Sequence, residues 1–198
     1  MGILKQGEFV LIQNKRDLQD FLKADKMQLG IARKFPRPLT DDIWKYEINL
    51  RKYEYWLNSK SVISRLVVIY YKMKHHRMGI RLGIEISPNV VGKGLSIAHG
   101  GCVEINDQAK VGDNLRIQEG VNIGASGGNA PVIQDNVFLA SGCKVMGSVV
   151  VKSGCVVGAN AVLVRTVDQD NCTIAGIPAK KISENNSERF VYWYKNHN

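Results

Sequence analysis

The stretch IQDNVFLASGCKVMGSVVVKSGCVVGANAVL, residues 133–163, decides the fold, because a large aliphatic residue returns at every sixth position. These positions are Ile133, Leu139, Val145, Val151, Val157 and Leu163. Small or apolar residues follow four places after each of the first five, at Val137, Cys143, Val149, Cys155 and Ala161. A period of six is neither the 3.6 of an α-helix nor the two of a half-buried strand. It predicts a parallel β-solenoid whose stacked coils bury one continuous aliphatic column.

The same period runs upstream of residue 133 and is broken twice. Its earlier members are Val91, Ile97 and Val103, and then, after a slip of two residues, Ile105, Val111, Ile117 and Ile123. The second break is the glycine-rich segment 124–131, which is too polar for the interior. Loops on a rigid scaffold often carry function, so we expect the chemistry near the two breaks.

Three helices are predicted before the repeat. Residues 14–29 form the first, with Asn14 as its cap and Gly30 at its end, and the second follows Thr40 or Asp41. The third runs from Ser61 to about Met78. Its apolar residues, expected to pack inward on the neighbouring helices, are Ile63, Leu66, Val67, Ile69, Tyr70 and Met73. Its other side is basic and without acids, so contact with an anionic membrane surface is the alternative for this helix.

Charge and periodicity together predict the domain organisation: a helical subdomain over 1–83, a solenoid over 84–182, and a short tail over 183–198. Residues 1–84 hold 17 Lys and Arg against 8 Asp and Glu, whereas residues 85–198 hold 10 against 10, so the whole net charge of +9 precedes the repeat. These basic residues are scattered and no nucleic-acid-binding motif accompanies them, so we expect no nucleic-acid partner. The aromatic tail, Phe190 to Tyr194, is expected to dock on its own or another subunit.

Several classes of protein are excluded by the composition. No apolar run approaches the roughly 20 residues that a membrane-spanning helix needs. The first residues lack the apolar core of a signal peptide, and Gln6 does not fit a myristoylation site, so we predict a cytoplasmic protein. The four cysteines form no Cys-x-x-Cys pair, so no metal is predicted, and Cys143 and Cys155 are expected to pack as small hydrophobic residues.

Five short motifs resemble those of the serine acetyltransferase family, a group of left-handed β-helix acyltransferases. They are Glu85-Ile86-Ser87-Pro88, Ile97-Ala98-His99-Gly100, Asn122-Ile123-Gly124, the segment 157–161 (VGANA) and the closing segment 175–180 (AGIPAK). The resemblance implies a left-handed helix, acetyl-CoA as the donor, and a homotrimer with active sites between subunits. The chain also resembles the short members of this family that occur in bacterial surface-polysaccharide loci.

The resemblance places the catalytic histidine at His99. Transfer from a thioester to a hydroxyl needs a base with a pKa near neutrality, which imidazole supplies. The family pairs this histidine with an acid in an Asp-Ile-His-Pro motif, so the resemblance gives Glu85 the role of orienting His99. The alternatives are a packed histidine at a coil corner and an ordinary exposed charge at Glu85.

The family also implies how this chain would hold CoA. Gly124 and Ala125 match the family's Gly-Gly, where a main-chain N–H can stabilise the thioester oxyanion. Ser141 and Ala159 match positions that line the pantetheine arm, and Lys180 is placed to meet a CoA phosphate. For Ala159 a tight coil without any ligand is the alternative.

The acceptor is where the sequence departs from the family. Serine-specific members of the family have Asp at the position of Ala98 and Arg at the position of Asn129. Asp41 weakly matches an acid that the family uses at its acceptor site. Leaving a substrate ammonium and carboxylate unpaired is expensive. We therefore predict O-acetylation of a sugar hydroxyl in capsule or O-antigen biosynthesis, by direct attack in a ternary complex. The alternatives are serine O-acetylation for cysteine synthesis and a non-catalytic β-helix scaffold.

Overall fold

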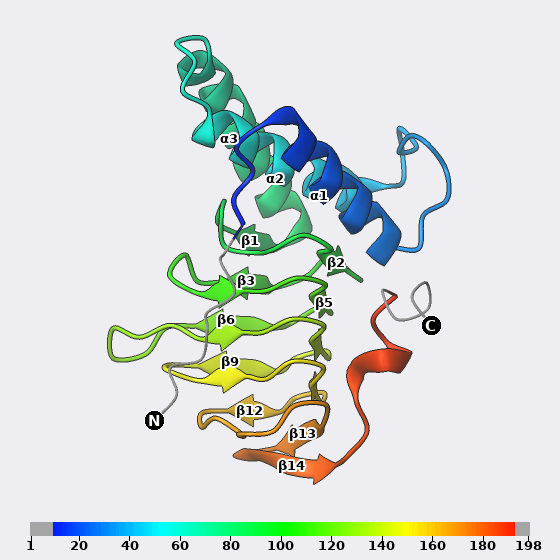
Figure 1. Ribbon diagram of the computed structural model, residues 1–198, viewed down its shortest axis with the longest axis vertical. Helices are drawn as coiled ribbons and strands as arrows, with labels where there is room; N and C mark the ends of the chain where they lie inside the picture. Colours follow the sequence, from blue (N-terminus) through cyan, green and yellow to red (C-terminus); the bar gives the residue numbers. More distant parts are fainter. Residues whose placement is uncertain (1–9, 193–198) are drawn as a thin grey trace.

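The computed structural model describes residues 10–192, and three helices lie across one end of a stack of β-coils (Figure 1). The N-terminal segment that bears on signal peptides and lipidation falls within residues 1–9, and Trp193 and Tyr194 of the tail also lie outside the described residues. Over the described part of the chain, no helix combines the length and apolarity that crossing a bilayer requires.

Helix α1 (Lys15–Gln28) begins and ends where the sequence predicts. The Asn14 side chain accepts from the backbone N–H groups of Arg16 and Asp17, and the Asp17 carboxylate accepts from the Asn14 N–H at 3.2 Å. This reciprocal capping box satisfies donors that the first helical turn leaves free. Gly30 follows the helix at a φ of 68°, a left-handed conformation that glycine adopts at no steric cost.

Helix α3 (Ser64–Leu82) packs against α2 (Asp42–Asn58), but not with the face that the sequence suggested. The prediction that the apolar residues of α3 point inward is wrong for Ile63, Leu66, Ile69, Tyr70 and Met73, which are all exposed. Polar and small residues make the contact instead. The His75 ring stacks on Tyr46 with centroids 4.8 Å apart, and a Cβ at Gly79 would come within 2.6 Å of the Ile84 carbonyl oxygen. At Gly79 the helix therefore lies too close to β1 for a larger side chain.

The predicted parallel β-solenoid is confirmed. It has a five-stranded sheet in the order β1-β3-β6-β9-β12, a three-stranded sheet β10-β7-β4 and a six-stranded sheet β14-β13-β11-β8-β5-β2. The strands are β1 (Ile84–Ile86), β2 (Ser96–Ile97), β3 (Val103–Ile105), β4 (Lys110–Val111), β5 (Arg116–Ile117), β6 (Asn122–Gly124), β7 (Val132–Ile133), β8 (Phe138–Leu139), β9 (Lys144–Met146), β10 (Val150–Val151), β11 (Val156–Val157), β12 (Val162–Leu163), β13 (Thr173–Gly176) and β14 (Ala179–Ser183). All pairs are parallel except β13 with β14, which closes the stack. The division into domains at residues 83 and 182 stays a prediction.

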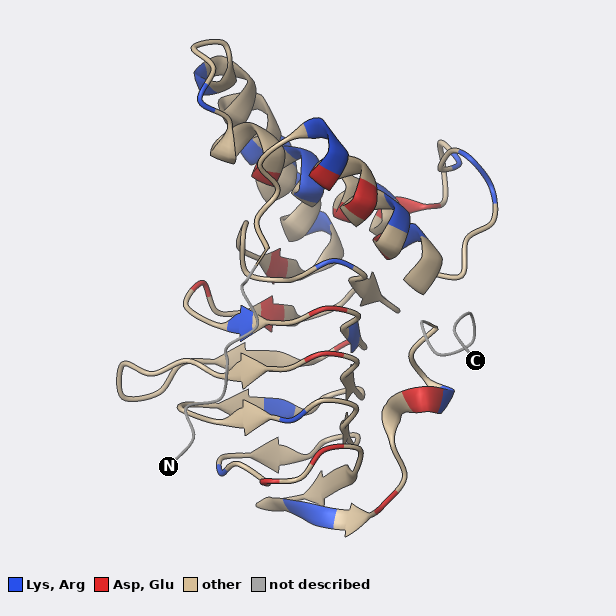
Figure 2. Ribbon diagram, viewed as in Figure 1, with Lys and Arg blue, Asp and Glu red and all other residues tan. Residues whose placement is uncertain are grey.

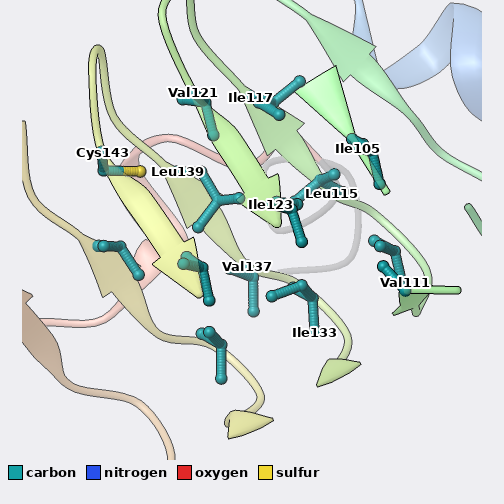
Figure 3. Packing of buried hydrophobic residues seen from close by; sticks show 14 of the residues in the cluster. Ile105, Val111, Leu115, Ile117, Val121, Ile123, Ile133, Val137, Leu139 and Cys143 are labelled. Atoms are coloured by element: carbon teal, nitrogen blue, oxygen red, sulfur yellow. The ribbon is translucent and has the colours of Figure 1, made fainter. Parts of the chain in front are cut away.

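The interior of the solenoid is the aliphatic column that the period of six predicts. The register places Ile117 over Leu139 and Leu139 over Val157, so equivalent positions stack from coil to coil. Figure 3 shows side chains from successive coils pointing into one shared interior. Cys143 and Cys155 are fully buried within it, as expected of small hydrophobic residues.

A buried ionic cluster, formed by Asp25, Glu47, Arg51 and Glu54, joins the helices to the first coil. Arg51 is completely buried; its Nε donates to Asp25 at 2.7 Å and its terminal nitrogen to Glu54 at 3.0 Å. The same guanidinium donates to the Val91 and Gly92 carbonyl oxygens, and the Asp25 carboxylate accepts from two backbone N–H groups of the first coil. Glu47 accepts from the Ile97 N–H at 2.9 Å, two residues before His99.

The C-terminal tail docks on its own solenoid. After the 3₁₀ turn η1 (Ser187–Arg189), Val191 is fully buried against Phe138, Ala140 and Val156. The Phe190 ring stacks on the Phe138 ring with centroids 4.3 Å apart. The tail therefore covers part of the six-stranded sheet beside the helices.

Candidate functional site

His99 lies in the turn between β2 and β3, directly against the end of α3. The Gly101 N–H donates to the Leu82 carbonyl oxygen at 2.8 Å, and the Val103 N–H donates to the Gly83 carbonyl oxygen at 2.9 Å. The His99 side chain is exposed on this turn. Its backbone is thus fixed by the helix end, while its imidazole is free to meet a substrate.

The His99 turn is the first of four turns that stack on one another along one edge of the solenoid. Backbone hydrogen bonds join each turn to the next: Gly120 N–H to Gly101 O at 2.8 Å, Gly142 N–H to Glu119 O at 2.9 Å, and Asn160 N–H to Ser141 O at 2.9 Å. His99, Glu119, Ser141 and Ala159 therefore share one corner of the solenoid, on successive coils. We call this column of turns the histidine corner.

Glu119 is the residue of this corner that the sequence analysis missed. A Cβ at Gly101 would lie 3.8 Å from the Glu119 Cβ, so the acid sits immediately beside the His99 turn. The Ser141 hydroxyl donates to Gln118 at 3.0 Å and has Glu119 as its other acceptor within reach. This contact lowers the pKa of Glu119, and the charge of His99 lowers it further. The second carboxylate oxygen, Oε2, is buried with no partner among residues 10–192.

Glu85, which the resemblance assigns to orient His99, lies on the first strand of the five-stranded sheet. It lies on β1, in register with Glu104 on β3, and lines a groove of about 710 Å³ that also holds His76 and Lys144. His99 does not line this groove. The orienting role of Glu85 stays a prediction.

Beside His99, a groove of about 370 Å³ brings together Asp41 and Ala98, which sequence analysis assigned to the acceptor. The Asp41 carboxylate is not free: it pairs with Arg33 at 2.6 Å and with Arg37 at 3.1 Å. The hydrogen bond from Arg33 and that from the Arg37 backbone hold the pKa of Asp41 well below its usual range. The groove therefore carries a neutralised acid rather than a free anionic site.

A second groove, of about 610 Å³, runs along the other side of the corner. Its floor is made of small residues, among them Ala140, Gly158 and Ala159, and a Cβ at Gly158 would come within 3.0 Å of Ala175. Arg116 and Arg189 add two cationic groups to its wall. A flat floor of small side chains with cations beside it fits a long phosphorylated chain such as CoA. Leu29 lines both this groove and the acceptor groove, so the two meet beside the helices.

Gly124, Ala125 and Asn129 are not at this corner. They belong to the end of β6 and the loop after it, which projects from the opposite side of the solenoid from β2 and β5 (Figure 1). Lys180 is exposed on β14 at the far end of the stack. Within one chain the structure thus joins His99, Ser141, Ala159, Ala98 and Asp41 around a corner, and leaves the remaining five predicted residues, Glu85 included, apart. Over residues 10–192, no cluster of three or more His, Cys, Asp or Glu side chains is arranged to hold a metal ion.

Comparison with known proteins agrees with this architecture. A family model described as bacterial transferase hexapeptide (six repeats) matches residues 130–165. The fold matches the soybean serine acetyltransferase apoenzyme with a TM-score of 0.66 at 23% identity, over 85% of this chain and 70% of that one. The repeats are thus similar to those of bacterial hexapeptide transferases, and the fold is the left-handed β-helix of solved serine acetyltransferases. The fold class and the family resemblance predicted from the repeat are therefore confirmed.

Curated relatives of this hexapeptide-repeat protein include two staphylococcal proteins named serine acetyltransferase. The one from Staphylococcus aureus (strain MW2) is 38% identical over 107 residues, 52% of this chain and 50% of the relative. The one from Staphylococcus xylosus is 31% identical over 147 residues, 72% of this chain and 63% of the relative. The chain thus spans about half the length of the first of these relatives.

A solved relative is the Neisseria gonorrhoeae serine acetyltransferase in complex with serine. It is 27% identical, with a TM-score of 0.59, over 85% of this chain and 68% of that one. The fold also matches the Brucella abortus serine acetyltransferase in complex with coenzyme A, with a TM-score of 0.63 at 21% identity, over 86% of this chain and 70% of that one.

Proposed function

We propose that this protein is an acetyl-CoA-dependent O-acetyltransferase whose base is His99. The observation that carries the proposal is the position of His99 between Ala98 and Gly100, which line one groove, and on the same corner as Ala159, which lines the other; Leu29 lines both grooves. One groove has a floor of small residues and two arginines for the donor, and the other, with Ala98 and Asp41, is open to an acceptor. The names of the curated relatives support the same class of reaction.

In the proposed reaction His99 first accepts a proton and later donates it. Its imidazole takes the proton of the acceptor hydroxyl while the hydroxyl oxygen forms a bond to the thioester carbonyl carbon. As the carbon–sulfur bond breaks, the imidazolium returns the proton to the departing thiolate. Ser141 and Ala159, which lie on the same corner as His99, are placed to line the donor's path to it.

We propose that Glu119, rather than Glu85, is the positioning residue for His99. Replacing it by glutamine keeps the size and removes the charge, so the imidazolium loses a stabilising neighbour. We expect Glu119→Gln to lower kcat by about tenfold or more and to move the acid limb of the kcat/KM pH profile to lower pH. Steady-state kinetics across pH checks both.

Glu85→Gln is the matched control for this variant, because it makes the same chemical change at the residue that the sequence singled out. We expect its pH profile to overlay that of the wild type. If the pH profile of kcat/KM shifts in Glu85→Gln and does not shift in Glu119→Gln, Glu85 is the residue that positions His99.

The acceptor that the comparisons favour is L-serine, and they support it better than the sugar predicted from the sequence. The curated relatives are named serine acetyltransferase, and the Neisseria gonorrhoeae protein was solved with serine. The second candidate, an uncharged sugar hydroxyl, is favoured by the groove itself. Ala98 brings no charge there, and Asp41 is already neutralised by Arg33 and Arg37.

A direct assay separates the two acceptors. With acetyl-CoA and L-serine we expect release of the CoA thiol and O-acetylserine by mass spectrometry. We further expect Ala98→Asp to raise kcat/KM for serine by about tenfold, since it supplies a partner for the ammonium group. Turnover only with neutral sugars, and no increase of kcat/KM for serine in Ala98→Asp, would instead identify a sugar hydroxyl as the acceptor.

We propose a homotrimer, because a neighbouring copy would supply what one chain leaves apart. Gly124, Ala125 and Asn129 lie away from His99 within the chain, as expected if they complete the site of the next subunit. Lys180 would then meet the far end of CoA. A cytoplasmic location and a role in surface-polysaccharide synthesis remain predictions from the sequence.

A further inference from the structure

The outward face of α3 is apolar although it faces solvent. Its exposed side chains are Leu66, Ile69, Tyr70, Met73 and Ile80, preceded by Val62 and Ile63 in the turn that enters the helix. Leu66 is 75% exposed and Ile80 is 72% exposed. Single exposed apolar residues are ordinary, but a contiguous set on one helix face marks a binding surface.

The spacing of these residues makes one stripe along the helix. Successive members are one, three or seven residues apart, and at about 100° per residue they all fall within an arc of about 120°. The opposite side of α3 carries Ser64, His75 and Gly79, which are turned toward α2 and β1. The apolar stripe is therefore the face that the fold leaves without a partner among the described residues.

Basic residues border this stripe on both sides. Arg65 and Lys72 lie along one edge and Lys74 and Arg81 along the other, while Arg77 lies between Met73 and Ile80. No acid occurs between Glu54 and Glu85, and only Arg81 of these basic residues has an ion-pair partner in the described chain, Asp42 at 2.9 Å. Figure 2 shows many basic residues on the helical end, where the acids belong to the segments that precede α3.

We propose that this face of α3 docks on an anionic lipid surface, with the stripe inserted among the acyl chains and the basic edges on the headgroups. An apolar face between cationic edges is the pattern of helices that lie in the membrane interface. The long stems of lysine and arginine allow their charges to stay in the headgroup region while the stripe enters. A second copy of α3 on the same face would bring cationic edges against each other, whereas anionic lipids neutralise them.

Vesicle flotation of the full chain tests this docking without any enzymatic assay. We expect the protein to float with vesicles of phosphatidylglycerol mixed with phosphatidylcholine, to stay behind with phosphatidylcholine alone, and to be released by salt. Leu66→Ser combined with Ile69→Ser should abolish flotation. Lys72→Gln combined with Lys74→Gln should weaken binding by about tenfold.

Matched controls make the same chemical changes elsewhere. Ile182→Ser alters an exposed isoleucine on β14, and Lys93→Gln with Lys110→Gln removes two charges from the solenoid; both proteins should float like the wild type. Circular dichroism and thermal melting confirm that each variant is folded. Failure of the wild type to float, or unchanged flotation of the Leu66/Ile69 variant, would overturn the proposal. A drop in native mass on light scattering in that variant, without vesicle binding by the wild type, would instead identify the face as an interface between copies.

Discussion

His99→Ala is expected to lower kcat for acetyl transfer by about 10²- to 10⁴-fold, the range that a positioned general base contributes. Without the imidazole, no base takes the proton from the acceptor hydroxyl, and no acid returns it to the departing thiolate. Because His99 is exposed and its turn is held by backbone hydrogen bonds of Gly101 and Val103, the fold should not change. The KM for acetyl-CoA should stay within about threefold, since the small-residue groove is untouched.

The control for this variant is His76→Ala. His76 is also an exposed histidine, but it lies in the groove with Glu85 and away from the corner. We expect its kcat to equal that of the wild type. Undiminished transfer by His99→Ala would contradict the proposed function, and loss in His76→Ala instead would move the chemistry to the Glu85 groove.

Arg51→Leu is expected to destabilise the fold by about 3–5 kcal/mol, because removal of one partner leaves buried charges uncompensated. Asp25 and Glu54 would keep their carboxylates inside the protein with no guanidinium, and the Val91 and Gly92 carbonyl oxygens would lose their donors. Denaturant unfolding measures the loss. Lys52→Ala, at the adjacent partly exposed position, should change the free energy of unfolding by less than about 0.5 kcal/mol.

The same variant should respond to pH in a defined direction. Burial raises the pKa of Glu54 and raises that of Glu47 well above its usual range, with the charge of Asp25 adding to the second shift. Such groups bind more protons in the folded than in the unfolded state, so stability falls as pH rises through the interval between the unfolded and folded pKa values. Loss of Arg51 removes a charge that opposes these shifts. The deficit of Arg51→Leu should therefore shrink as pH is lowered from neutrality toward 5, and a deficit independent of pH would contradict this account.

The solenoid could be predicted because its signal is local and repeated. Each inward position, from Ile133 to Leu163, is set by the same six-residue geometry, so one match supports the next. The cap of α1 at Asn14 is local as well, and it was found for that reason. His99 was assigned through the resemblance of Ile97-Ala98-His99-Gly100 to a family motif, and its place just before the first break in the repeat agrees with that prediction.

The rest depends on distances that the sequence does not encode. Glu119 follows His99 by one coil, and only the pairing of β2 with β5 shows that the two turns stack. Arg51 looks like any basic residue of a helix until Asp25 and the first coil enclose it. The sequence predicts that the stripe of α3 is in the core because exposure of apolar residues is costly, but His75 stacks on Tyr46 of α2 and Gly79 lies against β1, so the other face of α3 makes the contacts.

A crystal structure of the protein with CoA would show where the donor binds relative to His99. We expect the pantetheine arm to run along the groove floored by Ala140, Gly158 and Ala159, with the CoA sulfur within a few ångströms of the His99 ring. A sulfur atom in the groove that holds Glu85 and Glu104, or CoA bound only away from the corner, would contradict this expectation.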